Sequence, residues 1–293
     1  MDAALLLDKP LGLSSNAALQ RAKRIFGARK AGHAGTLDPL ASGLLLVLFG
    51  EATKFAGPLL EADKEYAARL MLGERTSTGD TEGEIVETKP VDVSAAQLGA
   101  ALDRFRGAIE QIPPMYSALK RNGVPLYKLA RRGEEVERLA RRVSISLLEV
   151  VEFSPPFLEL RIRCSKGTYI RTLAEDIGAA LGSAAHLAAL RRTESGKFRV
   201  RDAVTLDTLE RMPEGERQGR LVPLAGLLTE FPPARLDSLA EARFRNGQAL
   251  QLPGLGPGLC AVYGPGGGVI GLGLADGRGE LRPMRLTASQ AAE

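Results

Sequence analysis

One acidic residue, Asp38, lies in a position suited to covalent chemistry. It belongs to the segment GHAGTLDPLASGLLLVLFG, residues 32–50, in which a polar, glycine-flanked loop leads directly into an apolar run. Pro39 restricts Asp38 to extended backbone conformations, and Gly35 allows the chain to turn tightly before it. No second acid stands within helical or strand reach, which disfavours a glycosidase site with two carboxylates. The pattern indicates a nucleophile, and a structural Asp-Pro turn is the alternative.

The elements expected around this loop follow from hydrophobic periodicity and capping residues. Apolar runs predict buried strands over 44–49 and 65–72, and alternation predicts strands over 143–153 and 157–164. Only the Pro155-Pro156 turn separates the last two, which are therefore expected to pair antiparallel. Capped amphipathic stretches predict helices over 15–26, 94–106 and 168–181. A stretch rich in polar residues predicts a loop over 75–85.

Composition restricts the class of protein. With 293 residues, the chain is long enough for one large domain and one smaller domain. A hydrophobic content of 44% and a charged content of 25% are typical of a globular protein, and no segment approaches the length of a membrane span. The first residues do not resemble a signal peptide, and Cys164 and Cys260 stand far apart, so we expect a cytoplasmic protein. Two histidines and two cysteines leave little material for a metal site, and we expect none.

Basic residues gather in two parts of the chain. Residues 119–142 hold eight Lys and Arg against three acids, and residues 163–201 also hold eight against three. Such clusters favour a polyanionic partner, with a solvated surface as the alternative. Gly266, Gly268 and Gly271 match a dinucleotide-binding pattern, but strand-like sequence follows them, so we attribute this match to chance.

Six segments together resemble one enzyme family. GHAGTLDPLASGLLLV is similar to the catalytic-aspartate motif of the pseudouridine synthases, in the branch shared by tRNA-modifying enzymes and guide-RNA pseudouridylases. Five further segments resemble that branch in its own order: DKPLGLSSN (8–16), KEYAARLMLGERTSTGD (64–80), QIPPMYSALKRNGVPLYKLARRG (111–133), CSKGTYIRTLAEDIG (164–178) and LRRTESGKF (190–198). The resemblance covers residues 1–230 and implies an α+β fold with a mixed, mostly antiparallel central sheet and flanking helices and loops. Residues 234–286 resemble the small PUA RNA-binding β domain, so we expect a catalytic domain over 1–232 and a PUA-like domain over 233–293.

The resemblance implies that a uridine in the T-loop of tRNA, at position 55, is isomerised to pseudouridine. Asp38 would be the nucleophile, and attack on the uracil ring and attack on the sugar C1′ both remain open. Tyr66 matches the tyrosine that stacks on the flipped uracil, with proton removal at C5 as a further task. Arg171 matches the arginine that pairs with the catalytic acid. Without the resemblance, Tyr66 reads as a structural strand residue and Arg171 as a surface arginine. The reaction is redox-neutral, so no cofactor is expected.

A further group of residues would bind the substrate by resemblance. Its members are Lys9, His33, Lys64, Asp80, Tyr169 and Leu190. Asp80 would hold the RNA or the base, with an Asx turn as the equal alternative. His33 would help to displace the flipped base, and Tyr169 would pack in the same pocket. Lys9 and Lys64 would support the active site or a phosphate, with a solvated surface as the alternative.

An insertion over about 114–140 resembles the segment that closes over the T-arm loop of tRNA. Its cations for phosphate contacts are Lys120, Arg121, Lys128, Arg131 and Arg132, with Tyr116 and Tyr127 interleaved. We expect this insertion to be mobile without RNA. The partner would be tRNA, bound by a monomer that needs no protein partner and no membrane. The catalytic subunit of a guide-RNA pseudouridylation complex and a noncatalytic RNA-binding or RNA-folding protein remain as alternatives.

Overall fold

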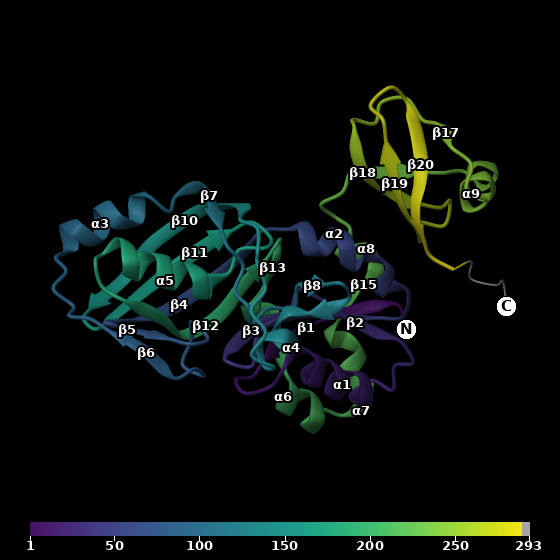
Figure 1. Ribbon diagram of the computed structural model, residues 1–293. Helices are drawn as coiled ribbons and strands as arrows, with labels where there is room; N and C mark the ends of the chain where they lie inside the picture. The colour runs from purple at the N-terminus through teal and green to yellow at the C-terminus, as the bar shows by residue number, and fades with distance from the viewer. Residues whose placement is uncertain (289–293) are drawn as a thin grey trace.

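A large mixed sheet forms the centre of the protein (Figure 1). The computed structural model describes residues 1–288. Within them, eleven strands form this sheet: β1 (Ala3–Lys9), β2 (Ala31–Ala34), β3 (Ala41–Phe49), β4 (Lys64–Leu72), β7 (Gly107–Gln111), β10 (Arg141–Ser154), β11 (Phe157–Cys164), β12 (Ala185–Ser195), β13 (Phe198–Arg199), β14 (Val204–Thr205) and β15 (Leu221–Pro223). The main path runs β14-β1-β3-β12-β4-β11-β10-β7, and only its β1–β14 and β3–β12 pairs are parallel within these residues. The predicted α+β class with a mixed, mostly antiparallel sheet is confirmed.

Helices and two small hairpins surround the sheet. The helices are α1 (Ser15–Ile25), α2 (Ala56–Glu61), α3 (Ala95–Asp103), α4 (Leu126–Ala130), α5 (Ile170–Ala180), α6 (Leu206–Arg211), α7 (Glu214–Arg217) and α8 (Leu224–Leu227), with 3-10 turns η1 (Gly50–Phe55), η2 (Val200–Asp202) and η3 (Gln218–Arg220). The hairpins are β5 (Glu74–Thr76) with β6 (Ile85–Thr88), and β8 (Lys120–Arg121) with β9 (Val124–Pro125). α5 packs against β4 and β12, whereas α1 and α6 pack beside β1 and β3.

Capping residues explain where two of the predicted helices begin. The Ser14 hydroxyl accepts a hydrogen bond from the Ala17 amide at 3.1 Å, and α1 starts at the next residue. Ser94 and Gln97 form a reciprocal capping box at the start of α3. Both helices are confirmed within a few residues of the predicted bounds.

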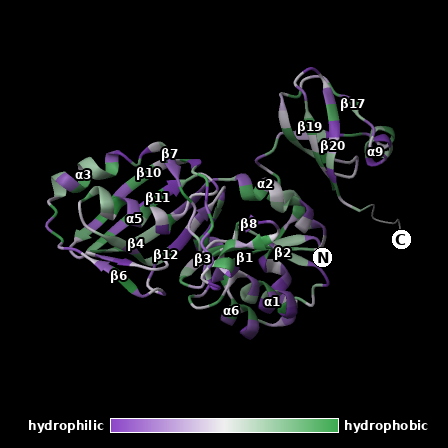
Figure 2. Cartoon of the chain, in the orientation of Figure 1, coloured by the Kyte–Doolittle hydropathy of each residue, from purple (hydrophilic) through white to green (hydrophobic). Residues whose placement is uncertain are grey.

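β3 is apolar throughout because both of its faces are covered. Leu44, Leu46 and Leu48 face one core, which also contains residues of the C-terminal domain, and the alternate residues face the core under α1. Along β10 and β11, by contrast, hydrophobic and hydrophilic residues alternate (Figure 2). One face of that pair packs under α5 and the other meets solvent.

Two local predictions were partly wrong. The predicted loop over 75–85 includes strand residues, because Arg75 pairs with Glu87 and Thr76 pairs with Ile85 in the β5–β6 hairpin. The predicted helix over 168–181 begins at Ile170, since Tyr169 has the extended backbone of an N-cap residue. Both errors concern element ends or very short strands, where periodicity gives no signal.

The C-terminal part forms a separate five-stranded sheet with the order β16-β18-β19-β20-β17 (Figure 1). Its elements are β16 (Pro233–Arg235), α9 (Ser238–Arg245), β17 (Leu250–Gln251), β18 (Gly258–Tyr263), β19 (Val269–Ala275) and β20 (Glu280–Leu286). Gly271 lies inside β19, so the glycine pattern has no dinucleotide-binding geometry. Ala261 and Leu272 pack with Leu227 and Leu228 in a core shared with the large sheet. The two parts of the chain are therefore joined by apolar contacts.

Candidate active site

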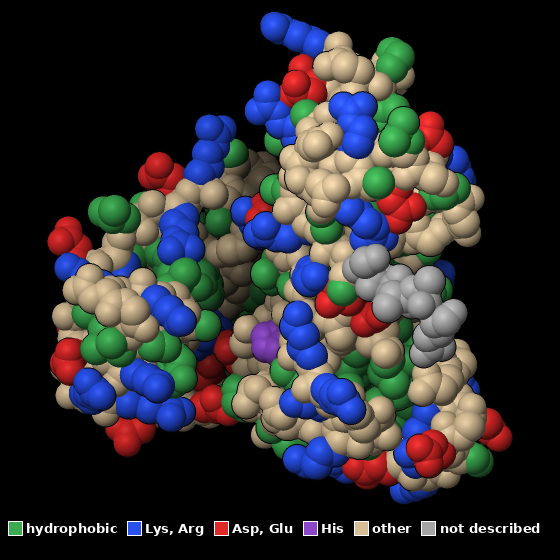
Figure 3. Space-filling view, turned by 90° about the vertical axis from the view of Figure 1, so that its right-hand side faces the viewer, with side chains coloured by type: hydrophobic (Ala, Val, Ile, Leu, Met, Phe, Trp, Pro, Cys, Tyr) green, Lys and Arg blue, Asp and Glu red, His purple; other side chains and the backbone are tan. Residues whose placement is uncertain are grey.

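A cavity of about 560 Å³ opens beside Asp38. Its walls come from the loop between β2 and β3, from β4 and β12, from the segment leading into α5, and from residues 117–119 of the insertion. Segments far apart in the sequence therefore meet at one cavity, which is the usual setting of an active site. In a space-filling view, Lys and Arg side chains lie on both sides of a hollow in one face of the molecule (Figure 3).

The loop that carries Asp38 is held by backbone hydrogen bonds and by one serine. The Asp38 carbonyl accepts from the Ala41 amide at 3.0 Å, and the Pro39 carbonyl accepts from Gly12 at 2.8 Å. The buried Ser15 hydroxyl bonds to both the amide and the carbonyl of Leu37, at 2.7 and 2.8 Å. This arrangement leaves the Asp38 side chain 46% exposed at the cavity on a fixed backbone.

Arg171 joins two carboxylates across the site. Its Nη2 lies 2.9 Å from Asp38 Oδ2, and its Nη1 lies 3.3 Å from Asp80 Oδ2. The same guanidinium donates to the carbonyls of Tyr116 at 2.7 Å and Thr78 at 3.2 Å. With its side chain only 8% exposed, Arg171 has little freedom to leave Asp38. The expected Asp38–Arg171 pair is present.

Asp80 forms the Asx turn that was one of its two predicted roles, and its role in holding the RNA or the base stays a prediction. Its Oδ1 accepts hydrogen bonds from the Glu82 amide at 3.1 Å and the Thr78 hydroxyl at 2.5 Å, as in an Asx turn. Its Oδ2 meets Arg171, and the side chain is 3% exposed. Asp80 is absent from the cavity wall, so its contact with the site passes through Arg171.

Tyr66, Tyr169 and Leu190 all line the cavity, as expected for residues that would surround a base. Tyr66 lies on β4 and Leu190 on β12, the neighbouring strand. Burial raises the pKa of both tyrosines, so both phenols are neutral near pH 7. The Tyr169 backbone is fixed by both side-chain groups of Gln111, at 2.9 and 3.1 Å.

Lys9 and Lys64 are buried, so a solvated surface is the wrong interpretation for both. The Lys9 ammonium donates to the carbonyls of Pro10 and Leu13 at 2.9 and 2.6 Å. The Lys64 ammonium likewise donates to the carbonyls of Leu60 and Ala62, at 2.6 Å each. Burial lowers the pKa of each lysine from 10.5 to about 8. Only Lys64 lines the cavity.

His33 is close to the site but lies outside the cavity wall. It sits on β2 opposite Val47, half-buried. Burial lowers its pKa, and the nearby Arg192 lowers it further, so the ring is neutral at pH 7. Among the described residues, no group bonds to its buried Nδ1.

The five cations of the insertion are exposed and lie outside the cavity. They are Lys120 and Arg121 on β8, Lys128 on α4, and Arg131 and Arg132 after it. Arg131 lies over the Tyr127 ring, 5.8 Å from its centroid. Ser117, Ala118 and Leu119 form part of the cavity wall, so the insertion connects a basic surface to the site.

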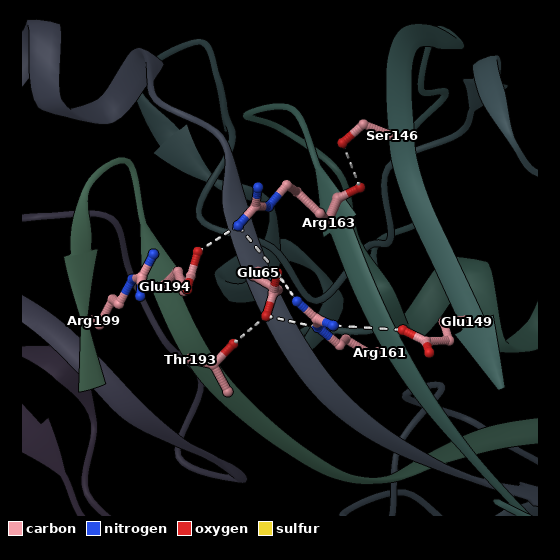
Figure 4. Close-up of polar contacts among 8 residues, drawn as sticks. All are labelled: Glu65, Ser146, Glu149, Arg161, Arg163, Thr193, Glu194 and Arg199. Carbon is pink, nitrogen blue, oxygen red and sulfur yellow. Dashed lines mark hydrogen bonds and ion pairs between the residues drawn. The ribbon is translucent and has the colours of Figure 1, made fainter. Parts of the chain in front are cut away.

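The opposite face of the sheet carries a network of ion pairs (Figure 4). Glu65 lies 3.1 Å from both Arg161 Nε and Arg163 Nη2, and Arg163 also pairs with Glu194. Burial opposes the ionisation of Glu65, but the two arginines outweigh it and lower its pKa. Three strands, β4, β11 and β12, are thereby tied together directly behind Tyr66.

Sequence reasoning missed Arg192, a fully buried arginine in the cavity wall. Strand alternation within LRRTESGKF indicates that one of the adjacent residues Arg191 and Arg192 faces the core, because neighbouring side chains of a strand point to opposite faces. Within residues 1–288 no group of three or more metal-ligating side chains occurs. No helix in that range has the length and apolar character needed to cross a membrane.

Comparison with known proteins identifies the family. The description "TruB family pseudouridylate synthase (N terminal domain)" matches residues 23–170. Residues 171–228 match "tRNA pseudouridylate synthase B C-terminal domain", and residues 232–287 match "Pseudouridine synthase II TruB, C-terminal". The chain belongs to the TruB family of pseudouridylate synthases. The resemblance inferred from the sequence is confirmed, whereas the PUA-like assignment of 233–293 stays a prediction, and residues 289–293 lie outside the described part.

Relatives within the TruB family match the whole chain. The tRNA pseudouridine synthase B of Burkholderia mallei (strain NCTC 10247) is 52% identical over 298 residues, covering 99% of this chain and 98% of that protein. The protein of the same name from Azoarcus sp. (strain BH72) is also 52% identical, covering 100% and 97%. A chain in the structure of an H/ACA RNP bound to a substrate RNA containing 2′-deoxyuridine matches with a TM-score of 0.75 and 26% identity, covering 97% and 84%. A chain of the archaeal Nop10-Cbf5 complex matches with a TM-score of 0.74 and 27% identity, covering 97% and 85%.

Proposed function

We propose that this protein isomerises a uridine of the tRNA T-loop, at position 55, to pseudouridine. Its relatives at 52% identity over nearly the full chain carry the name tRNA pseudouridine synthase B. The observation that carries the proposal is the pairing of Asp38 with Arg171 at a cavity that Tyr66 and Leu190 also line. This arrangement offers a nucleophile beside a surface that can receive one flipped base.

The chemistry assigned to Asp38 is nucleophilic attack, either on the uracil ring or on the sugar C1′. A carboxylate needs no activating base for this step, and Arg171 at 2.9 Å fixes its orientation. The N1–C1′ bond then breaks, the base turns, and a C5–C1′ bond forms. The bond between Asp38 and the nucleotide breaks to regenerate the carboxylate, and N1 takes up a proton as C5 loses one. Atoms and electrons balance within the one nucleotide, so the proposed reaction uses no cofactor.

Base recognition is assigned to the apolar and aromatic part of the cavity. Tyr66 would stack on the flipped uracil, a contact worth about 1–3 kcal/mol, which offsets a similar cost of unstacking. Tyr169 and Leu190 would border the base, since both line the same cavity. His33 would take the place of the base in the RNA stack, consistent with its neutral ring and its unbonded Nδ1 among residues 1–288.

RNA binding is assigned to two further parts of the chain. The cations of the insertion would contact phosphates of the T-arm, because they are exposed on the segment that continues into the cavity wall. We assign residues 1–232 to a catalytic domain and the segment from 233 to an RNA-binding domain, which begins where β16 joins the second sheet. We also propose that the protein acts in the cytoplasm as a monomer.

Tritium release tests this function. tRNA labelled with tritium at C5 of uridine should lose label with the wild type and retain it with Asp38→Asn, and the modified nucleotide should map to the T-loop. Equal release by both proteins would exclude Asp38 as the nucleophile. Binding of tRNA without release by the wild type would favour a noncatalytic RNA-binding protein.

A catalytic subunit of a guide-RNA complex is the second candidate. It is supported by the TM-score of 0.75 to a chain of an H/ACA RNP, although identity falls from 52% to 26%. The purified chain alone, with an unmodified tRNA transcript, separates the candidates. Turnover without guide RNA or other proteins supports the tRNA enzyme, and sedimentation of the same sample tests the monomer.

A further inference from the structure

Arg192 has an environment that is unusual for a buried cation. It lies on β12, where its register partners are Tyr66 on β4 and Gly43 on β3. The side chain is 1% exposed, yet within residues 1–288 it forms no ion pair, and the Asp38 carboxylate pairs with Arg171 instead. A buried charge without a counterion needs another reason to be there, since charged side chains are rarely buried unpaired.

The guanidinium bonds to the segment that carries Asp38. Its Nε donates to the Leu44 carbonyl at 2.7 Å, its Nη2 to Gly35 at 3.1 Å, and its Nη1 to Thr36 at 3.4 Å. These carbonyls lie on both sides of Asp38 in the chain. A side-chain carbon added at Gly35 would lie 3.3 Å from Nη1, so loop and guanidinium are in close contact. One side chain thus spans the whole base of the catalytic loop.

The same guanidinium faces the other groups of the site. Arg192 and Tyr66 both line the cavity, and Arg192 opposes the burial that raises the pKa of the Tyr66 hydroxyl. Burial is the main cause that lowers the pKa of Lys9, Lys64 and His33, and the charge of Arg192 lowers the pKa of each of them further. The other titratable groups near these residues are Asp38 beside Lys9 and Tyr66, Asp63 and Glu61 beside Lys64, and the Cys164 thiol beside Lys64 and Tyr66. Burial raises the pKa of that thiol to about 11, so it is neutral.

We propose that Arg192 is a positioning residue, which holds the Asp38 loop against the strand of Tyr66 and maintains a positive charge beside the Tyr66 hydroxyl. This inference rests on the proposed isomerisation for its effect on rate, but the loop contacts are independent of that function. A guanidinium is suited to the task because it presents several donors in one plane, which an ammonium cannot do.

Three variants separate the parts of the proposal. Arg192→Met removes both charge and donors, whereas Arg192→Lys keeps the charge and loses the planar set of donors. Arg191→Met is the matched control, because Arg191 is the adjacent arginine, points to the opposite face and pairs with Asp8 at 2.7 Å. Each variant is measured for single-turnover tritium release, tRNA affinity, thermal unfolding and amide hydrogen exchange of residues 35–44.

The expected result is a loss of rate without a loss of binding. Arg192→Met should reduce the single-turnover rate by about 100-fold, and Arg192→Lys by at least about tenfold, with tRNA affinity nearly unchanged. Exchange of amides 35–44 should increase by about tenfold in both, and by less than about twofold in Arg191→Met. The pH profile of Arg192→Met should move to higher pH by at least about half a unit, whereas that of Arg192→Lys stays in place. A purely structural role would instead lower the rate equally at every pH.

Rates within about threefold of wild type in either Arg192 variant, or unchanged loop exchange, would overturn the proposal. If Arg192→Met does not fold, Arg192→Lys decides by the same two criteria. If the wild type releases no tritium, the proposed function fails, and the exchange measurement alone then supports or overturns the positioning role.

Discussion

Lys9 gives the most direct test of the electrostatics of this site, because its ammonium is fully buried and bonded only to carbonyls. Burial lowers its pKa from 10.5 to about 8. In the unfolded chain the pKa of Lys9 returns to 10.5. Between pH 8 and 10.5 the unfolded state therefore binds more protons than the folded state, and the free energy of unfolding rises with pH. The whole shift corresponds to about 3 kcal/mol at neutral pH, of which about 1.4 kcal/mol is recovered between pH 7 and pH 9.

Replacing Lys9 with methionine removes this titration and keeps the length of the side chain. Urea unfolding at pH 7, 8 and 9 should show that the wild type gains about 1.4 kcal/mol more than Lys9→Met across this range. Lys64, whose pKa is also about 8, is present in both proteins and cancels in the comparison. The difference at any single pH also contains the loss of a donor to Pro10 and Leu13, so the change with pH is the quantity to measure.

The exposed Lys30 supplies the control for this experiment. Lys30→Met should follow the wild type across the whole pH range, because an exposed ammonium has nearly the same surroundings in both states. Equal pH dependence in the wild type and Lys9→Met would refute the reasoning, since the buried ammonium would then titrate as it does in water.

Three further predictions concern other parts of the protein. Arg171→Met should lower the free energy of unfolding, measured in urea, by about 3–5 kcal/mol, because it leaves the Asp80 carboxylate buried and unpaired. Adding Asp80→Asn to this variant should restore stability, but it should not restore tritium release. Replacing Lys120 and Arg121 with glutamine should reduce the slope of log affinity against log salt by about 0.7–0.9 for each lost phosphate contact, at an unchanged single-turnover rate. Leu272→Ala should cost about 2–5 kcal/mol by calorimetry and should destabilise both sheets together, because Leu272 lies in their shared core; loss of only a small separate transition would contradict this.

Much of the fold could be predicted because its signals are local. Alternation identified β10 and β11, Ser14 and Ser94 fixed the starts of two helices, and an unbroken apolar run identified β3. These features depend on a few consecutive residues. The β5–β6 hairpin was missed because strands of three and four residues are too short to show a period.

The site was predictable only in part. The glycine-flanked loop singled out Asp38, and the family resemblance supplied Arg171 as its partner. The burial of Lys9, and which of the adjacent Arg191 and Arg192 is the buried one, could not be read from the sequence, because lysine and arginine are exposed in most proteins and burial depends on strands distant along the chain. The double role of Asp80 was also hidden, since its Asx turn is local but its contact with Arg171 comes from a distant helix.

The buried cations of the site fall into two groups, and the difference bears on RNA binding. Arg171 is neutralised by carboxylates, whereas Lys9, Lys64 and Arg192 are bonded to carbonyl oxygens and pair with no acid in residues 1–288. A carbonyl satisfies a donor but cancels no net charge, so the second group leaves a positive field around Asp38 at a cost in stability. That field attracts a polyanion toward a carboxylate that would otherwise repel it. Under the proposed function, these cations would therefore offset the repulsion between Asp38, the proposed nucleophile, and a phosphate-rich substrate.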